Sequence, residues 1–173
     1  ECAESTGKNI AVVGGGPGGL SAAYFLQLMG HQVTVYEMLP KLGGMLRYGI
    51  PNYRLSKERL DDDIQAILDT GVKVDCGKVI GKDYSIVDLK EKYDAVLITI
   101  GASTDKKLGL EGEDAKGVIS AVQFLRDVGY GTQESLEGKE VAVIGGGNVS
   151  MDAARTSVRL GAKKVSIVYR RRV

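Results

Sequence analysis

A pattern of strand, glycine-rich turn, helix and strand occurs twice in this sequence, first over residues 9–37 and again over residues 140–169. Each copy is close to the ~30 residues that a βαβ unit occupies. A crossover helix between two strands requires the strands to pair in parallel. The repeat therefore predicts an α/β protein, with one Rossmann-like βαβ domain followed by the first part of a second.

The first turn contains Gly14, Gly16 and Gly19 in the spacing GxGxxG, between an apolar run at 9–13 and helical spacing of apolar residues at 20–28. Gly14 permits a tight turn, Gly16 lets the backbone approach a pyrophosphate, and Gly19 allows the helix to pack closely on the strand. The N-terminus of the helix then presents N–H donors to the phosphates. Glycines after a strand can also simply form a turn, but the strand, the helix and an acidic residue at the end of the second strand together favour a dinucleotide site.

The second strands of the two copies end in different residues. Glu37 ends the first copy, where an acidic side chain accepts hydrogen bonds from ribose hydroxyls and repels a 2′-phosphate. The first turn is therefore expected to bind FAD or NAD rather than NADP. In the second copy the turn residues are Gly145, Gly147 and Ser150, with a small serine at the helix-packing position.

Arginines follow Tyr169 at the corresponding end of the second copy, at Arg170, Arg171 and Arg172. Guanidinium groups match phosphate oxygens in bidentate pairs, so this position favours the 2′-phosphate of NADPH. A solvated basic run without a ligand is the alternative interpretation. Two turns with opposite preferences indicate FAD and NADPH as the pair of cofactors, with hydride passing from the nicotinamide to the flavin. No side chain is required as acid or base, so no catalytic residue is assigned.

The rest of the pattern divides the chain into four parts. They are an N-terminal tail at 1–8, an FAD-binding domain at 9–104 that lacks its C-terminal return, a connection at 105–139, and the truncated start of an NAD(P)H-binding domain at 140–173. Strands are also expected at 72–74, 79–80 and 95–100, a loop at 42–51, and helices that begin at Ser56, Ser85 and Ser120. Because the second copy stops where a nucleotide domain normally continues, the chain is expected to be part of a longer protein.

Composition excludes several classes of function. A formal net charge of +1 provides no global attraction to nucleic acid or to an anionic membrane. No segment reaches the roughly 20 apolar residues that a membrane span needs. Cys2 and Cys76 are too few for a disulfide framework or a zinc site, which suggests a reducing, cytoplasmic location. No metal ligands are expected in this chain.

Four stretches resemble the two-dinucleotide-binding-domain flavoproteins, and within them the NADPH-dependent glutamate synthase small (β) subunit type. These stretches are AVVGGGPGGLSAAYFL, VTVYEMLPKLGGMLRYGIPNYRL, YDAVLITIGA and VAVIGGGNVSMDAARTSVRLGAKKVSIVYRRR. The resemblance covers nearly the whole chain, and LGGMLRYGIP is its most specific part. It implies that Gly44 and Arg47 lie by the flavin, Val79 near the adenine end of FAD, and Gly101 at the crossover between the domains. The complete set of cofactor-binding residues expected is Gly14, Gly16, Pro17, Gly18, Gly19, Glu37, Lys41, Gly44, Arg47, Val79, Gly101, Gly145, Gly146, Gly147, Asn148, Ser150, Arg170 and Arg171.

The resemblance also implies a route for the electrons. Related disulfide reductases carry a redox-active cysteine pair, but neither 42–51 nor 130–139 contains a cysteine. Electrons are therefore expected to leave FAD for iron–sulfur centres in an absent segment or in a partner subunit, such as one like the glutamate synthase large subunit. The alternatives are a flavin subunit of an electron-bifurcating transhydrogenase, of a hydrogenase or formate dehydrogenase complex, or of a dihydropyrimidine dehydrogenase. A non-catalytic nucleotide-binding module is a further alternative.

Overall fold

The computed structural model describes residues 2–171, and these form two compact units. The first unit contains the residues up to Arg47 together with Leu55–Gly101. The second contains Tyr48–Arg54 together with the residues from Ala102 onward. The short segment 48–54 thus belongs to the second unit, although both of its chain neighbours belong to the first.

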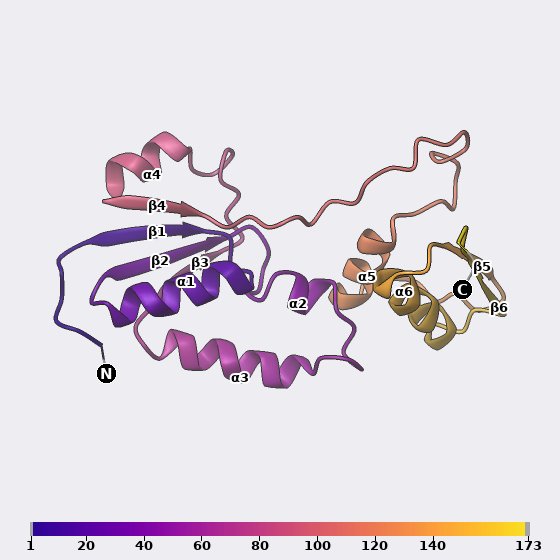
Figure 1. The fold of residues 1–173 in the computed structure, drawn as a ribbon, viewed down its shortest axis with the longest axis horizontal. Coiled ribbons are helices and arrows are strands. Elements are labelled where there is room, and N and C mark those ends of the chain that lie inside the picture. Colours follow the sequence, from indigo (N-terminus) through magenta and orange to yellow (C-terminus); the bar gives the residue numbers. More distant parts are fainter. Residues whose placement is uncertain (1, 172–173) are drawn as a thin grey trace. The chain divides into compact units, whose positions relative to one another are not determined.

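A four-stranded parallel sheet forms the centre of the first unit (Figure 1). Its strands, in the order β3-β2-β1-β4, are β3 (Lys73–Cys76), β2 (Gln32–Glu37), β1 (Asn9–Val13) and β4 (Ala95–Ile98). In the register of the sheet, Val13 pairs with Tyr36 on one side and with Ile98 on the other. The predicted α/β class with parallel pairing is confirmed.

Helices cover both faces of this sheet. They are α1 (Pro17–Leu28), α2 (Met45–Tyr48), α3 (Lys57–Leu68) and α4 (Ile86–Lys92). Strand alternation sends Val12 and Val35 to the face covered by α1 and α3, where they pack with Leu20, Leu60 and Ile64. Ala11, Val13 and Tyr36 point to the opposite face, where Leu89 of α4 is buried. The first glycine turn lies between the end of β1 and the start of α1, so the packing of these two elements fixes its position.

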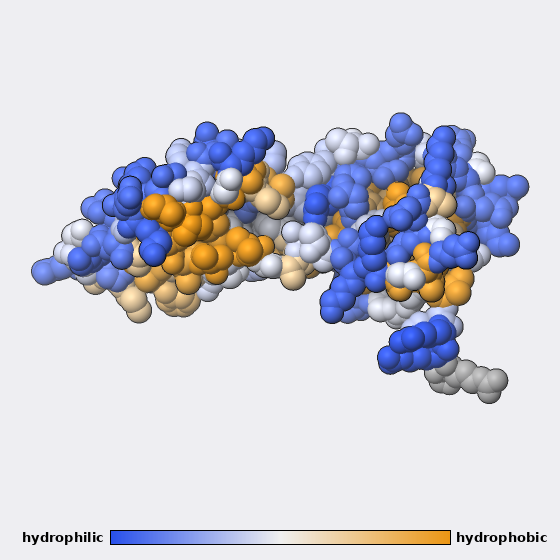
Figure 2. Space-filling view, turned by 90° about the horizontal axis from the view of Figure 1, so that it is seen from above, coloured by the Kyte–Doolittle hydropathy of each residue, from blue (hydrophilic) through white to orange (hydrophobic). Residues whose placement is uncertain are grey.

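The outer edge of β4 is exposed. Ile98 is 57% accessible, and Leu97 and Ile100 are also exposed apolar residues. Figure 2 looks onto the first unit from above, and apolar surface is visible there. The strand expected at 95–100 is present as β4, but its expected burial is wrong, because a strand at the edge of a sheet has a neighbour on only one side. The expectation that the FAD-binding domain lacks its C-terminal return stays a prediction.

The second unit contains the second copy of the repeat. Its elements are α5 (Ala121–Tyr130), β5 (Glu140–Ile144), α6 (Asn148–Arg159) and β6 (Lys164–Val168). Strands β5 and β6 pair in parallel, from Glu140 with Lys164 to Ile144 with Val168. Phe124 and Leu125 of α5 pack with Val143, Ala153 and Ala154 to make the core of this unit. The predicted internal repeat of a βαβ unit is therefore present.

Local signals at helix starts agree well with the structure, whereas two loop regions differ from expectation. Ser56, Ser85 and Ser120 all cap helices, and Ser85 forms a reciprocal capping box with Asp88. The predicted strand at 79–80 is reduced to a single bridge between Ile80 and Tyr84. The predicted loop at 42–51 contains the one-turn helix α2.

No helix within residues 2–171 is both long and apolar enough to span a bilayer. Across the same described part of the chain, no three His, Cys, Asp or Glu side chains are grouped so that they could ligate a metal ion.

Candidate functional site

The first glycine turn begins where β1 ends. Gly14 has a φ of +108° and donates its N–H to the carbonyl of Tyr36 at 2.8 Å. A Cβ added at Gly14 would lie 2.4 Å from the backbone oxygen of Thr99, so only glycine fits here. A Cβ added at Gly19 would lie 1.8 Å from the oxygen of Gly14. Gly14 therefore makes the turn, and Gly19 allows α1 to approach the end of β1.

The N-terminus of α1 has no side-chain cap. Gly16 is the N-cap residue, Pro17 begins the helix, and the first turn contains no acidic residue. A Cβ added at Gly18 would meet no atom within 4 Å, and one at Gly16 would meet only Gly44, at 3.8 Å. Since the first N–H groups of a helix lack intrahelical partners, this end of α1 presents free donors and a partial positive charge.

The serine-capped helices provide an internal comparison. In α3, α4 and α5 a serine side chain accepts an N–H of the first turn. Only α1 and α6, among the helices for which an N-cap is described, start from a glycine with no side-chain hydrogen bond. These two helix starts are therefore the ones left open to an external anion.

The Glu37 carboxylate lies against the first turn and is only 5% exposed. One of its oxygens accepts the N–H of Gly15 at 2.7 Å, and the other accepts the N–H of Leu39 at 2.8 Å. A carboxylate has about four acceptor positions, so two amide bonds leave capacity for a further donor. The two amides fix the negative charge at the carboxyl end of β2, beside the open start of α1.

A second glycine pair, Gly43 and Gly44, packs on the first turn. The N–H of Gly43 donates to the oxygen of Gly15 at 2.8 Å. A Cβ added at Gly44 would lie 2.8 Å from the Cα of Gly16. The loop after β2 therefore packs directly on the first glycine turn. Its two glycines, with no side chains, allow its backbone to contact the backbone of Gly15 and Gly16.

Arg47 follows this loop in α2, and its side chain is turned into the first unit. The residue is 8% exposed, and its guanidinium group contacts the carbonyl of Leu42 and the carboxylate of Asp61. Lys57 donates to the carbonyl of Leu46 at 2.7 Å nearby. Burial, together with the Arg47 charge, lowers the pKa of Lys57 below its usual value. Arg47 therefore holds α2 to α3, and its expected place beside the flavin stays a prediction.

The other residues expected at the first site lie in different parts of the unit. Lys41 is an exposed residue of the loop that follows β2. The N–H of Val79 donates to the carboxylate of Asp83 at 2.8 Å. Gly101, with a φ of +67°, is the last residue of the first unit before the chain enters the second.

The second glycine turn repeats the geometry of the first. The N–H of Gly145 donates to the carbonyl of Val168 at 2.9 Å, as that of Gly14 donates to Tyr36. Gly145 has a φ of +126°, and Gly147 is the uncapped N-cap residue of α6, which begins at Asn148. A Cβ added at Gly145 would lie 2.6 Å from the Ser150 hydroxyl oxygen. Serine at the helix-packing position therefore fits only because residue 145 has no side chain.

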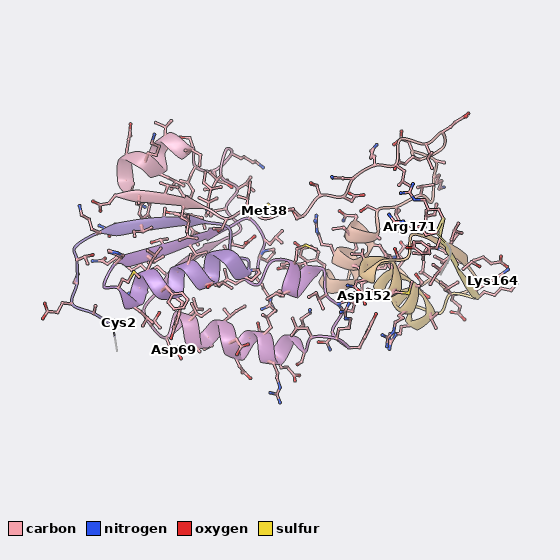
Figure 3. All side chains as sticks on the ribbon, in the orientation of Figure 1. Cys2, Met38, Asp69, Asp152, Lys164 and Arg171 are labelled. Atoms are coloured by element: carbon pink, nitrogen blue, oxygen red, sulfur yellow. The ribbon has the colours of Figure 1, made fainter. Side chains whose placement is uncertain are left out.

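The equivalent hydrogen bonds of Gly14 and Gly145 place Tyr169 at the position that Glu37 occupies in the first copy. A Cβ added at Gly146 would lie 2.7 Å from the Tyr169 ring. Arg170 and Arg171 follow and are exposed, and Figure 3 labels Arg171 beyond the end of β6. Arg172, also expected to contact a phosphate, lies outside the described residues. The second turn thus has an aromatic ring and two cations where the first has a buried carboxylate.

Three contributors to these turns are absent from the set predicted from sequence. Thr99 donates its hydroxyl to the carbonyl of Val13 at 3.0 Å and to that of Gly14 at 3.1 Å. Gly15 supplies the amide that fixes Glu37, and Tyr169 packs on Gly146. Aligning the two copies by their glycines would have found Gly15 and Tyr169, but no sequence signal connects Thr99 to a turn so far away in the chain.

In each copy, parallel strands flank a helix whose N-cap is a glycine without a side-chain hydrogen bond, α1 after β1 and α6 after β5. This arrangement defines a Rossmann-like dinucleotide-binding fold, which occurs twice. The chain belongs to the pyridine nucleotide-disulphide oxidoreductase family, whose profile matches residues 8–173. This membership confirms the predicted resemblance to dinucleotide-binding oxidoreductases.

Comparisons with individual proteins agree. The chain is 47% identical over 171 residues to the NADP(+)-dependent formate dehydrogenase subunit beta of Moorella thermoacetica, covering 98% of this chain and 24% of that protein. It is 39% identical over 178 residues to the glutamate synthase [NADPH] small chain of Escherichia coli (strain K12), covering 97% and 38% respectively. Among solved structures, FprA of Mycobacterium tuberculosis in complex with NADPH matches with a TM-score of 0.81 and 28% identity, covering 95% of this chain and 44% of FprA. The chain therefore spans less than half the length of each of these proteins.

Proposed function

We propose that the protein to which this chain belongs is an FAD-dependent oxidoreductase that takes hydride from NADPH and passes the electrons to a partner subunit. The observation that carries the proposal is the contrast between two otherwise equivalent turns. Glu37 lies beside the first, whereas Tyr169, Arg170 and Arg171 lie at the matching place of the second. One chain therefore discriminates two nucleotides by the charge at the end of a strand.

The first turn fits the pyrophosphate of FAD. The open N–H groups at the start of α1 would bind the phosphates, and the missing side chain at Gly16 leaves room for them. Glu37 would accept a ribose hydroxyl, and its fixed negative charge disfavours a 2′-phosphate. Gly44 is assigned to the flavin side of this site, with Lys41, Arg47, Val79 and Gly101 as further contacts. When bound, FAD supplies a two-electron acceptor that can release electrons one at a time.

The second turn fits NADPH. Gly145, Gly146, Gly147, Asn148 and Ser150 form the turn and the open start of α6, which would bind the pyrophosphate. Arg170 and Arg171 would bind the 2′-phosphate through charge-assisted hydrogen bonds. The names of several relatives support this choice, since the formate dehydrogenase subunit is NADP(+)-dependent and the glutamate synthase small chain is specified as NADPH.

The proposed electron acceptor is an iron–sulfur centre of a partner subunit or of a segment outside this chain. Subunits of larger enzymes, a beta subunit and a small chain, are among the relatives and support a partner. Our preferred assembly is glutamate synthase-like, with a large subunit as the partner. A formate dehydrogenase complex is the second candidate, favoured by 47% identity to its beta subunit against 39% for the glutamate synthase small chain.

The complete protein tests this function. It would be purified with FAD, freed of oxygen and mixed with NADPH while the visible spectrum of the flavin is recorded. Bleaching of the bound flavin supports the oxidoreductase. Retention of both nucleotides without bleaching contradicts it and favours a nucleotide-binding module without turnover.

A further inference from the structure

The peptide bond that links Gly14 to Gly15 is held from both sides by side chains of the first unit. Its carbonyl oxygen, which belongs to Gly14, accepts the hydroxyl of Thr99 at 3.1 Å. Its N–H, which belongs to Gly15, donates to a carboxylate oxygen of Glu37 at 2.7 Å. The C=O and N–H of a trans peptide point in opposite directions, so the two side chains hold opposite edges of one planar group.

The order of the strands explains why these two side chains meet the same peptide. Strand β1 lies between β2 and β4 and is parallel to both (Figure 1). Glu37 is the last residue of β2, and Thr99 directly follows β4, so both lie at the edge of the sheet where the chain leaves β1. All of these contacts lie within the first unit.

The Thr99 hydroxyl reaches beyond the backbone pairing of β4 with β1. It also lies 3.0 Å from the Val13 carbonyl, but that carbonyl already accepts the backbone N–H of Thr99 at 2.8 Å. The Gly14 oxygen comes after Val13, the last residue of β1 that pairs with β4. A Cβ added at Gly19 would lie 1.8 Å from the Gly14 oxygen and 2.8 Å from the Thr99 hydroxyl oxygen. The hydroxyl therefore binds the Gly14 oxygen at the place where the first turn of α1 packs on it.

The orientation of this peptide also determines the environment of Glu37. The carboxylate is buried, and its second oxygen accepts the N–H of Leu39 at 2.8 Å. The other amide donor comes from the Gly14–Gly15 peptide, so rotation of that peptide would remove it. Hydrogen bonds that follow one another in a chain polarise each other, so the bond from Thr99 strengthens the bond to Glu37. Thr99 thus acts on the carboxylate through the peptide.

We propose that Thr99 is a positioning residue for FAD, because its hydroxyl orients the peptide whose N–H fixes the Glu37 carboxylate. The inference rests on the proposed function, in which Glu37 accepts a hydroxyl of the adenosine ribose. A group that is already in place before the ligand arrives spares the cost of ordering it on binding. Thr99 therefore acts on the affinity for FAD, through the ribose end of the site.

The test compares Thr99→Val with Thr99→Ser in the complete protein, freed of FAD and titrated with it. Valine keeps the shape of threonine but has no hydroxyl, whereas serine keeps the hydroxyl. Thr99 is half-buried at the end of an edge strand, where both residues fit, so folding is retained. The Kd for FAD is expected to rise about tenfold in Thr99→Val and less than about threefold in Thr99→Ser. Equal weakening in the two variants, or an unchanged Kd in Thr99→Val, would overturn the proposal.

Thr70 provides a matched control in the same unit. Its hydroxyl donates to the carbonyl of Ile67 at 2.6 Å, just after the end of α3. Thr70→Val removes the same kind of hydrogen bond, so it is expected to lower the midpoint of chemical unfolding about as much as Thr99→Val. Its Kd for FAD is expected to change less than about twofold. A rise in Kd as large as that of Thr99→Val would count against the proposal, because lost stability would then explain both.

A change in the ligand separates positioning of Glu37 from a general structural role. An FAD analogue with 2′,3′-dideoxyadenosine has no adenosine ribose hydroxyl for Glu37 to accept. Thr99→Val is therefore expected to weaken this analogue less than about threefold, against about tenfold for FAD. The same loss for both ligands would show that Thr99 does not act through Glu37, and the proposal would fail.

Hydrogen exchange distinguishes failure of this inference from failure of the proposed function. In the protein freed of FAD, deuterium uptake by peptides covering residues 13–19 is expected to rise in Thr99→Val but not in Thr70→Val. If the unmodified protein binds no FAD, the proposed function fails, and deuterium uptake alone decides whether Thr99 holds the peptide. Uptake that stays the same in Thr99→Val would refute the inference.

Discussion

Tyr169 packs against Gly146 at the place where Glu37 accepts the N–H of Gly15 in the first copy of the repeat. The backbone geometry of the two turns is otherwise matched, since Gly14 and Gly145 both have positive φ and donate to equivalent carbonyls, those of Tyr36 and Val168, near the end of the second strand of each copy. Because the scaffold is the same, the difference in ligand is expected to follow from side chains at this one position and just beyond it.

The close approach of α1 to β1 predicts that Gly19→Ala destabilises the protein. The added methyl group would meet the Gly14 oxygen, and overpacking of this kind costs about 1–3 kcal/mol. Chemical unfolding of the protein without added nucleotide measures the effect. Gly18→Ala is the matched control, since a Cβ there meets nothing within 4 Å, and its unfolding midpoint should be unchanged or slightly raised. Equal destabilisation by both variants would show that the helix start and not the contact is responsible.

Glu37→Gln removes one of the two acceptors that the buried carboxylate provides. The amide group of glutamine turns an N–H toward either Gly15 or Leu39, and leaving a buried donor unpaired costs about 1–3 kcal/mol. The free energy of unfolding should therefore fall even in the absence of FAD. A variant that binds FAD less tightly with unchanged stability would contradict the view that Glu37 organises the turn.

Replacing Arg170 and Arg171 by Ala is expected to weaken the binding of NADPH far more than the binding of NADH. Each lost charged hydrogen bond costs about 1.5–3 kcal/mol, which is about 10- to 150-fold in Kd. Both affinities would be measured by titration of the complete protein. Lys164→Ala serves as the control because Lys164 is an exposed cation at the start of β6, whereas Arg171 lies beyond its end (Figure 3). Loss of the same size for both nucleotides is the result that refutes the assignment.

Cys76 should react slowly with alkylating reagents. Burial, reinforced by the negative charges of Glu37 and Asp75, raises the pKa of its thiol above the usual value of 9.0. A raised pKa means less thiolate in the folded protein, and the thiolate is the reactive form. At about pH 8, iodoacetamide should modify Cys76 more slowly in the folded than in the unfolded protein. The raised pKa also affects stability. As the pH rises through the ordinary thiol pKa, Cys76 ionises in the unfolded chain before it does in the folded protein, so the free energy of unfolding falls. Mass mapping that shows equal rates would contradict this environment.

The sequence predicts most of the elements that make up the two turns. The positive φ of Gly14 and Gly145 is a local requirement of the turn, and serine caps such as Ser85 act on the adjacent turn of helix, so both can be predicted from neighbouring residues. The exposure of β4 depends on which strand lies beside it, and residues near in sequence do not carry that information.

Contacts between distant residues could not be predicted in the same way. Thr99 reaches the carbonyl of Val13 and Arg54 reaches Asp152, across separations of 86 and 98 residues. The contact of the buried Arg47 with Asp61 is another example, because α3 brings that carboxylate back to α2; the place of Arg47 beside the flavin stays a prediction. Such contacts depend on tertiary packing, and the sequence of either segment alone does not predict them.

A crystal structure of the complete protein with both FAD and NADPH tests the central claim most directly. The account predicts the FAD diphosphate at the open start of α1, a ribose hydroxyl on Glu37, and the 2′-phosphate of NADPH within hydrogen-bond distance of Arg170 or Arg171. The 2′-phosphate found remote from both arginines, or either diphosphate bound away from its glycine turn, would contradict the account.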